Sequence, residues 1–450
     1  MKARFLIALG LLMLVGVAGA VLMFSGRRPE WTTPSPQALA AFQQGLDSLQ
    51  KIYYNEAAKD FAKAVELDPN FVVAKRFLLM MKDSPSSKKE AEEIIGQLKG
   101  ADLSKLTGRE RFLITYALAN HDKDPAKAQK ILQDFAASNP NDPYALDLLA
   151  SAATARQDWA EARRLLTRLI EVAPNRVVAY NQLGYLEMGM GRFAEAEKLF
   201  ETYRYIAPDQ ANPHDSLGEL FILTGRYDDA RRELEDALRI RPDFCASYEH
   251  LVILALVDGR PEEAQQAMAR AGKTGGCPEY SIKAMRCRIA VWVPFLASDW
   301  QALWKGEQTE CTEKDGRDPV LNLWAALATG RRADAEGIVT KIRDDVAKMP
   351  AGAPGRRYAE ALLAHMEGAV LLSQGQAAEA AERFRFADEG FSYREIGPGI
   401  FKLVNRVVLA RALQAVGSRE QAQAVLAEAR AVNAKFVERL EALTVPLAPS

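Results

Sequence analysis

The chain has 450 residues, a formal net charge of −1 at pH 7 and only 8% aromatic residues. Its near-neutral charge offers no basic surface of the kind that binds nucleic acid, so we expect no nucleic-acid partner. Ala, Leu, Glu and Arg dominate, and no segment alternates Val, Ile and Thr with polar residues, which favours an all-α chain over one with a sheet.

The first 28 residues predict a helix that targets the chain to a membrane. Phe5 to Phe24 carries no charge, and twenty helical residues rise about 30 Å, enough to cross a bilayer core. The alternative is a cleaved signal peptide, since Ala18-Gly19-Ala20 fits a small-residue cleavage site. Because the apolar run continues past that site, we expect a single-pass anchor in a bacterial inner membrane with the body in the periplasm. After cleavage, the body would be periplasmic or secreted.

Residues 29–37 are polar and rich in proline. This composition is typical of a linker, and we expect it to lift the body off the membrane.

From residue 38 onward the sequence repeats with a period of 34 residues. The period is clearest in four segments that abut without a gap: 143–176, 177–210, 211–244 and 245–278. One position in each segment holds a small residue: Ala162, Ala196, Ala230 and Ala264. A proline follows twelve residues later in the first three: Pro174, Pro208 and Pro242. Proline cannot continue a helix, so the pattern predicts a helix that ends before it and a hairpin in each segment.

Small residues at two further places agree with such hairpins. Gly184 and Gly218 stand where the first helix would face the alanine of the second, so the two helices can approach closely. Gly191, Gly225 and Gly259 stand between the helices, where the left-handed conformation that ends a helix suits glycine.

The pattern resembles the tetratricopeptide repeat, most closely in Asn181-Gln182-Leu183-Gly184-Tyr185 together with Ala196, Phe200 and Pro208. This resemblance implies a solenoid of helical hairpins wound as a right-handed superhelix. We expect eleven helix pairs in three stretches of the chain: a regular array at 38–278, a divergent hairpin at 279–315 and degenerate repeats at 316–436. A C-terminal tail at 437–450 follows them. Residues 35–71 and 106–128 also look like the repeat regions of bacterial serine/threonine kinases and winged-helix regulators, without an output domain.

Motifs that would carry catalysis do not occur. The sequence has no G-x-S-x-G elbow, no phosphate-binding loop and no His-Glu-x-x-His zinc motif, and it has only four histidines. We therefore expect no enzyme activity, no cofactor, no metal and no small-molecule substrate. Trp292, Trp300 and Trp304 cluster in the divergent hairpin, where core packing is the favoured interpretation and an exposed binding patch the alternative.

The resemblance places the partner-binding surface on the first helices, which line the concave face of such arrays. The second, fifth, ninth and twelfth residues of each unit would contact the partner, and the candidates are Tyr144, Asp147, Asn181, Tyr185, Met188, Asp215, Glu219 and Glu249. An acidic floor flanked by Tyr and Met suits a basic or mixed apolar peptide, although these charges could simply solvate the face. Repeats that clamp a terminal carboxylate need Lys, Asn and Arg here, and this chain departs from that pattern.

These observations predict a scaffold or adaptor that binds proteins or peptides. The alternative is an accessory subunit of an envelope enzyme or of an export or assembly complex, of the cytochrome-maturation or polysaccharide-export type.

Four cysteines, Cys245, Cys277, Cys287 and Cys311, lack the paired spacing of a zinc site. In an exported body, Cys277 and Cys311 would flank the divergent hairpin, and two antiparallel helices would bring them to the same end. We therefore expect these two to form a disulfide.

Overall fold

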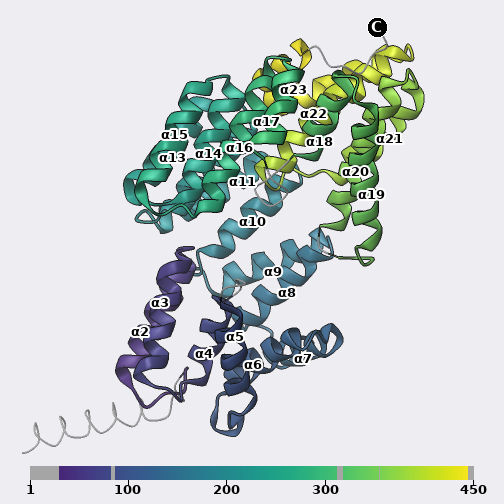
Figure 1. The fold of residues 1–450 in the computed structure, drawn as a ribbon. Helices are drawn as coiled ribbons and strands as arrows, with labels where there is room; N and C mark the ends of the chain where they lie inside the picture. The colour runs from purple at the N-terminus through teal and green to yellow at the C-terminus, as the bar shows by residue number, and fades with distance from the viewer. Residues whose placement is uncertain (1–29, 83–86, 312–317, 354, 444–450) are drawn as a thin grey trace, which may run out of the picture. The chain divides into compact units, whose positions relative to one another are not determined.

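The computed structural model describes residues 30–82, 87–311, 318–353 and 355–443, and every regular element in these ranges is helical (Figure 1). The expected all-α hairpin solenoid is confirmed. The chain divides into two compact units, residues 1–140 and 141–450. This boundary falls within the array that the sequence pattern treats as continuous, 38–278.

The described helices α2 to α23 form eleven consecutive pairs, as the repeat pattern predicts. The first unit holds three of these pairs and a short 3-10 helix: α2 Pro36–Gln50, α3 Tyr54–Leu67, α4 Val72–Met80, α5 Lys88–Lys99, η2 Leu103–Lys105, α6 Gly108–His121 and α7 Pro125–Ser138. The second unit opens with four regular pairs: α8 Pro143–Ala155, α9 Trp159–Val172, α10 Val178–Gly189, α11 Phe193–Ile206, α12 Ala211–Leu223, α13 Tyr227–Ile240, α14 Cys245–Asp258 and α15 Pro261–Thr274. Four less regular pairs follow: α16 Glu279–Leu296, α17 Trp300–Thr309, α18 Pro319–Ala328, α19 Arg332–Lys348, α20 Arg356–Ser373, α21 Ala377–Gly390, α22 Ile396–Ala415 and α23 Arg419–Ala442.

The start of the described chain is not the free linker that its composition suggests. Trp31 is only 3% exposed, and its ring packs edge-on against Phe42 and Phe77, with centroids 5.2 and 6.4 Å away. The backbone nitrogen of Thr32 donates a hydrogen bond to Glu110 Oε1 at 2.7 Å. An indole removed from water gains free energy by apolar burial, so residues 30–37 are fixed to the first unit.

The helix that we expect at residues 1–28 lies outside the described residues. In the ranges that the structure does describe, no helix combines the length and apolarity that a membrane span requires.

Close contact within each hairpin depends on the small residues. Ala196 is fully buried, and an added Cβ at Gly184 would lie 2.3 Å from Cε1 of Phe200 on the facing helix. The turn glycines Gly191, Gly225 and Gly259 have φ near +74°, the left-handed conformation that the sequence predicts there.

Replacing Gly184 by Ala is expected to lower the free energy of unfolding by about 1–3 kcal/mol, because the new methyl group collides with the Phe200 ring. Gly272→Ala is the matched control, since it also lies in a helix and an added Cβ there meets no atom within 4 Å. Urea titrations of both variants test this. A Gly184→Ala midpoint equal to that of Gly272→Ala would contradict the close packing of α10 on α11.

The tryptophans of the divergent hairpin serve the core. Trp292 is buried, and its ring lies 6.3 Å from Phe401 on α22 and 6.4 Å from Phe436 on α23. Phe295 contacts both Trp300 and Trp324. The favoured interpretation of Trp292 as a packing residue is confirmed, and its partners are the last two helices of the chain.

The cysteine pairing differs from our expectation. Cys277 bonds to Cys245 and Cys287 bonds to Cys311, with Cα–Cα distances of 4.9 Å in both disulfides, so the predicted Cys277–Cys311 pair is wrong. Helix α16 has 18 residues and α17 only 10. Cys311 at the end of the short helix therefore meets the middle of the long one, at Cys287, and does not reach its beginning.

Mapping of peptides under non-reducing conditions is expected to yield two cross-linked pairs, Cys245 with Cys277 and Cys287 with Cys311. Extraction with a thiol-blocking reagent prevents exchange between them. A Cys277–Cys311 peptide, or four blocked thiols, would contradict the arrangement of α14 to α17.

Candidate functional site

The first helices of the regular repeats are covered by the end of the chain. The backbone nitrogen of Ile396, the first residue of α22, donates to Glu219 Oε1 on α12 at 2.7 Å. Asn433 of α23 donates to the carbonyl of Ile222 at 3.1 Å and accepts from the hydroxyl of Tyr227 at 3.1 Å. Figure 1 shows α22 and α23 beside α14 and α16. The side expected to hold a partner thus holds two helices of the same chain.

The predicted groove residues are accordingly engaged within the chain. Asn181, Met188, Asp215 and Glu219 are buried. The prediction of a solvent-facing acidic floor is therefore wrong for its central part. Tyr185 and Glu249 are half-buried, as are Tyr144 and Asp147 at the α8 end.

Even at that end the charges are paired. Asp147 accepts hydrogen bonds from Arg176 at 2.9 Å and Gln182 at 3.1 Å, and the same guanidinium lies 4.5 Å from the centre of the Tyr144 ring. Glu249 is half-buried near the far end of the series. The structure does not bring the eight candidates together as one exposed surface.

Five of the candidate and neighbouring side chains form a polar network, in which Asp215, Ser247 and Glu219 are buried and Tyr185 and His250 are half-buried. Asp215 lies 3.0 Å from His250 Nδ1 and accepts from Ser247 at 2.7 Å. Glu219 accepts from the hydroxyl of Tyr185 at 2.6 Å and lies 3.8 Å from His250 Nε2. Each of the two acids has a hydrogen-bond donor or a cation beside it, as a carboxylate removed from water requires. The network therefore has a structural role beneath α22.

The network changes proton affinities. Burial alone would lower the pKa of His250, but the negative charges of Asp215 and Glu219, with the hydrogen bond to Asp215, outweigh it and raise the pKa to about 9. Burial raises the pKa of the Glu219 carboxyl and, with the charge of Glu219, raises that of the Tyr185 hydroxyl well above its usual value. The half-buried His250 therefore carries a positive charge at neutral pH.

Stability is expected to fall as pH rises from about 6.5 to 9. The pKa of His250 is higher in the folded chain than in the unfolded chain, so its contribution is fully present below 6.5 and is lost as pH passes about 9. The loss is at most about 3 kcal/mol. Urea unfolding at pH 6 and pH 9.5, without added thiol, measures it. His250→Gln should flatten this dependence, and an equal slope in both proteins would contradict the assignment.

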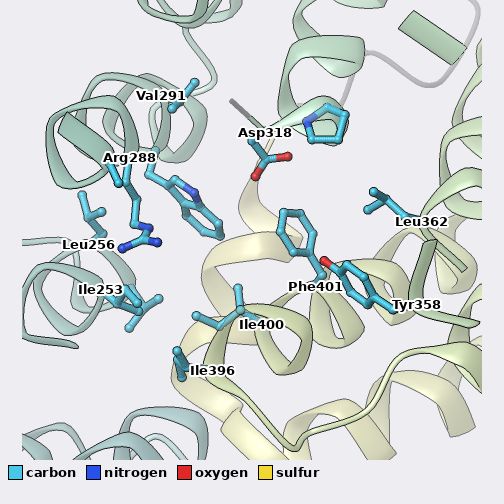
Figure 2. Close-up of a pocket in the computed structure, with 15 residues that line it drawn as sticks. Ile253, Leu256, Arg288, Val291, Asp318, Tyr358, Leu362, Ile396, Ile400 and Phe401 are labelled. Carbon is cyan, nitrogen blue, oxygen red and sulfur yellow. The ribbon is translucent and has the colours of Figure 1, made fainter. Parts of the chain in front are cut away.

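A cavity of about 280 Å³ lies next to this network, where α14, α16, α20 and α22 meet the start of α18 (Figure 2). Most of its walls are apolar, including Ile253, Leu256, Trp292, Ile400 and Phe401. Ligand cavities in proteins are commonly apolar with a few convergent polar groups, and this one has three such groups. They come from Arg288, Asp318 and Tyr358.

These three polar side chains are half-buried, and burial shifts their pKa values. Burial lowers the pKa of Arg288, while the charges of Glu249 and Asp318 act in the opposite direction. Burial raises the pKa of Asp318 to about 6, although the backbone nitrogens of Leu321 and Val320 donate to its Oδ1 atom. Burial also raises the pKa of the Tyr358 hydroxyl. Sequence patterns gave no sign of this cavity, since Arg288 and Asp318 are 30 positions apart and belong to no repeat position.

A second cavity, of about 760 Å³, lies between the carboxyl ends of α8 and α10 and the connection from α21 to α22. Ala155, Gly189 and Met190 line it from the regular repeats, Arg357 lines it from α20, and Arg394 lines it from the covering segment, the connection between α21 and α22. The covering segment approaches closely at one edge, where an added Cβ on Gly189 would lie 3.0 Å from Cβ of Arg394. The cavity therefore lies on the first-helix side of α8 and α10.

In the described ranges, no three His, Cys, Asp or Glu side chains are placed to hold a metal ion. His365 is buried, hydrogen-bonds Asn405 at 2.9 Å and stacks on Trp324. Burial lowers the pKa of this histidine to about 4, which makes it a neutral packing residue.

Comparison with known proteins agrees with the hairpin geometry. Residues 175–243, which span α10 to α13, match the tetratricopeptide repeat family. No curated protein matches the chain in sequence.

Similar solved structures include a crystal structure of PilW, described as a widely conserved type IV pilus biogenesis factor, at 16% identity and a TM-score of 0.37. The match covers 44% of this chain and 92% of that one. PilF of Pseudomonas aeruginosa is 17% identical in sequence, with a TM-score of 0.30. The match covers 53% of this chain and 91% of PilF. A crystal structure of the APC/C hetero-tetramer Cut9-Hcn1 is 12% identical in sequence, with a TM-score of 0.46. That match covers 90% of this chain and 75% of the other. Residues 175–243 therefore match tetratricopeptide repeats, and the eleven helical hairpins in the described residues agree with a fold of this repeat type.

Proposed function

We propose that this protein is a scaffold that binds a segment of a partner protein in the open cavity at the α8–α10 end of its repeats. The observation that carries the proposal is the cavity of about 760 Å³ left uncovered by α22. It is lined by residues of α8 and α10, Thr154, Ala155, Leu186 and Gly189, and first helices are the ones with which repeats of this family bind peptides.

The lining favours a segment of mixed character over a strongly basic one. Arg357 and Arg394 contribute positive charge, Glu389 and Glu395 negative charge, and Met190 an apolar contact. Arg357 already donates to Gln157 and to the carbonyl of Glu389, whereas Arg394 faces the cavity with no side-chain bond to another described residue. A partner with an acidic group beside an apolar residue would complement this edge.

We further propose that the body lies outside the cytoplasm, tethered by residues 1–28. Two observations support this location. The first is the uncharged run from Phe5 to Phe24. The second is the pairing of all four cysteines, because structural disulfides persist in oxidising compartments and are rare in the cytosol.

Site-specific photocrosslinking tests the binding site. A photoreactive residue replaces Ala155, which is exposed at the cavity edge, in the full chain expressed in its native membranes. The control carries the same residue at Glu201, which is exposed on α11 away from the cavity. We expect a discrete adduct with another protein at position 155 and none at 201. Adducts at both positions, or at 201 only, would refute the proposed surface.

Charge reversal supplies a second test on the same adduct. Arg394→Glu is expected to reduce the yield of the adduct several-fold, because charges at the rim of a binding site act mainly on the association rate. Lys198→Glu, exposed on α11, is the matched control and should leave the yield of the adduct unchanged.

The proposed location is tested separately. Protease added to intact spheroplasts should digest the body, and survival of the body until the membrane is permeabilised would place it inside.

A further inference from the structure

The cavity beside Trp292 carries an inference that is independent of the proposed scaffold function. It brings one cation and one carboxylate to the walls of an otherwise apolar space (Figure 2). Arg288 extends from α16, and Asp318 stands before α18 on a different wall.

The two opposite charges do not neutralise each other directly. Among the described residues, Arg288 makes no hydrogen bond, and the charges of Glu249 and Asp318 act on it only from a distance. Asp318 uses Oδ1 to cap α18 through Val320 and Leu321, and its other oxygen receives no hydrogen bond from a described residue. A charge that is removed from water without a partner raises the free energy of the protein. A ligand that forms an ion pair with each of the two groups would relieve this cost, which favours its binding.

The walls specify the rest of such a ligand. A volume of about 280 Å³ admits only a small molecule, and aliphatic and aromatic side chains from four helices surround it. The ligand therefore needs an apolar body, a carboxylate for the guanidinium and a cationic group for the carboxylate.

We propose that this cavity binds a free α-amino acid with an apolar side chain, with its carboxylate on Arg288 and its ammonium group on Asp318. A guanidinium can donate two parallel hydrogen bonds to a carboxylate. The ammonium group donates to the free oxygen of Asp318 while the cap of α18 stays intact. A peptide terminus carries one of the two charges without the other, so the site distinguishes a free amino acid from the end of a protein chain.

Calorimetric titration of the full chain in detergent tests this with defined probes. L-leucine and L-phenylalanine are the ligands, N-acetyl-L-leucine lacks the ammonium group, and L-leucinamide lacks the carboxylate. We expect saturable binding of at least one free amino acid and at least roughly tenfold weaker binding of both derivatives, because each loses one charge-assisted hydrogen bond. Quenching or enhancement of tryptophan fluorescence should follow the same titration, since Trp292 lines the cavity.

Two variants assign the contacts. Arg288→Met should weaken the binding of L-leucine at least roughly tenfold, so that L-leucine no longer binds more tightly than L-leucinamide. Asp318→Asn keeps an acceptor that caps helices as well as Asp does, and it should abolish the advantage of L-leucine over N-acetyl-L-leucine. Arg286→Met, an exposed change on the same helix, is the control and should bind as the unaltered chain does. Melting curves establish that each variant is folded.

Three results would overturn the proposal. The first is that neither free amino acid binds the unaltered chain. The second is that N-acetyl-L-leucine binds that chain as tightly as L-leucine, which would make a terminal carboxylate the ligand. The third is that Arg286→Met weakens binding as much as Arg288→Met. The first two need no variant, so they hold even if a substitution impairs folding.

Discussion

Replacing Asp215 by Lys is expected to lower the free energy of unfolding by about 3–5 kcal/mol, the usual cost of leaving a buried charge without its partner. Asp215 is 3% exposed, accepts a hydrogen bond from Ser247 and faces His250, which carries a proton at neutral pH. A lysine would put a second cation against His250 and leave the Ser247 hydroxyl without its acceptor. The midpoint of urea unfolding, followed by far-UV circular dichroism, measures the loss.

The matched control for this substitution is Glu201→Lys. Glu201 lies exposed in the middle of α11, so the same reversal of charge there should change stability by no more than about 0.5 kcal/mol. If the two variants unfold at the same urea concentration, Asp215 faces solvent and the first-helix side is an open groove after all.

The hairpins were predictable because their determinants are local. The small residues, turn glycines and prolines recur every 34 positions, and each one acts on a helix only a few residues away. Gly184 meets Phe200, and Gly191 adopts a positive φ, as the pattern requires. The eleven pairs follow from repeating this short-range logic along the chain.

The closure of the repeats by α22 and α23 was not predictable in this way. Asn433 and Tyr227 are 206 positions apart, and no periodicity relates them. One signal was present, however. Residues 251–257 read Leu-Val-Ile-Leu-Ala-Leu-Val, which leaves no polar face on the second half of α14. A helix that is apolar on all sides is buried on all sides, and a groove-lining helix should not be. The repeat register describes one helix pair at a time and carries no information on contacts with distant helices. It therefore assigned these residues to a groove.

The disulfides illustrate the same limit on a smaller scale. Two cysteines meet when they lie at similar distances on either side of a turn, and Cys287 and Cys311 satisfy this condition about the turn between α16 and α17. Choosing Cys277 for that role assumed helices of equal length. The helix boundaries, which the divergent sequence conceals, decide the pairing.

Removing the Phe436 side chain is expected to detach the end of the chain from the repeats. Phe436 is fully buried on α23 against Trp292, and Phe436→Ala should cost about 3–5 kcal/mol through lost burial and the cavity left behind. Phe386→Ala on α21 is the control, since Phe386 is 52% exposed and has little burial to lose. Urea unfolding gives the free energy, and limited proteolysis locates the change. We expect early cleavage between 396 and 443 in Phe436→Ala only, because loss of this anchor weakens the docking of α23 while the hairpins of the regular repeats keep their own contacts. If both variants resist protease and unfold together, α23 is not held by this contact, and the first-helix side would be open to partners along its whole length.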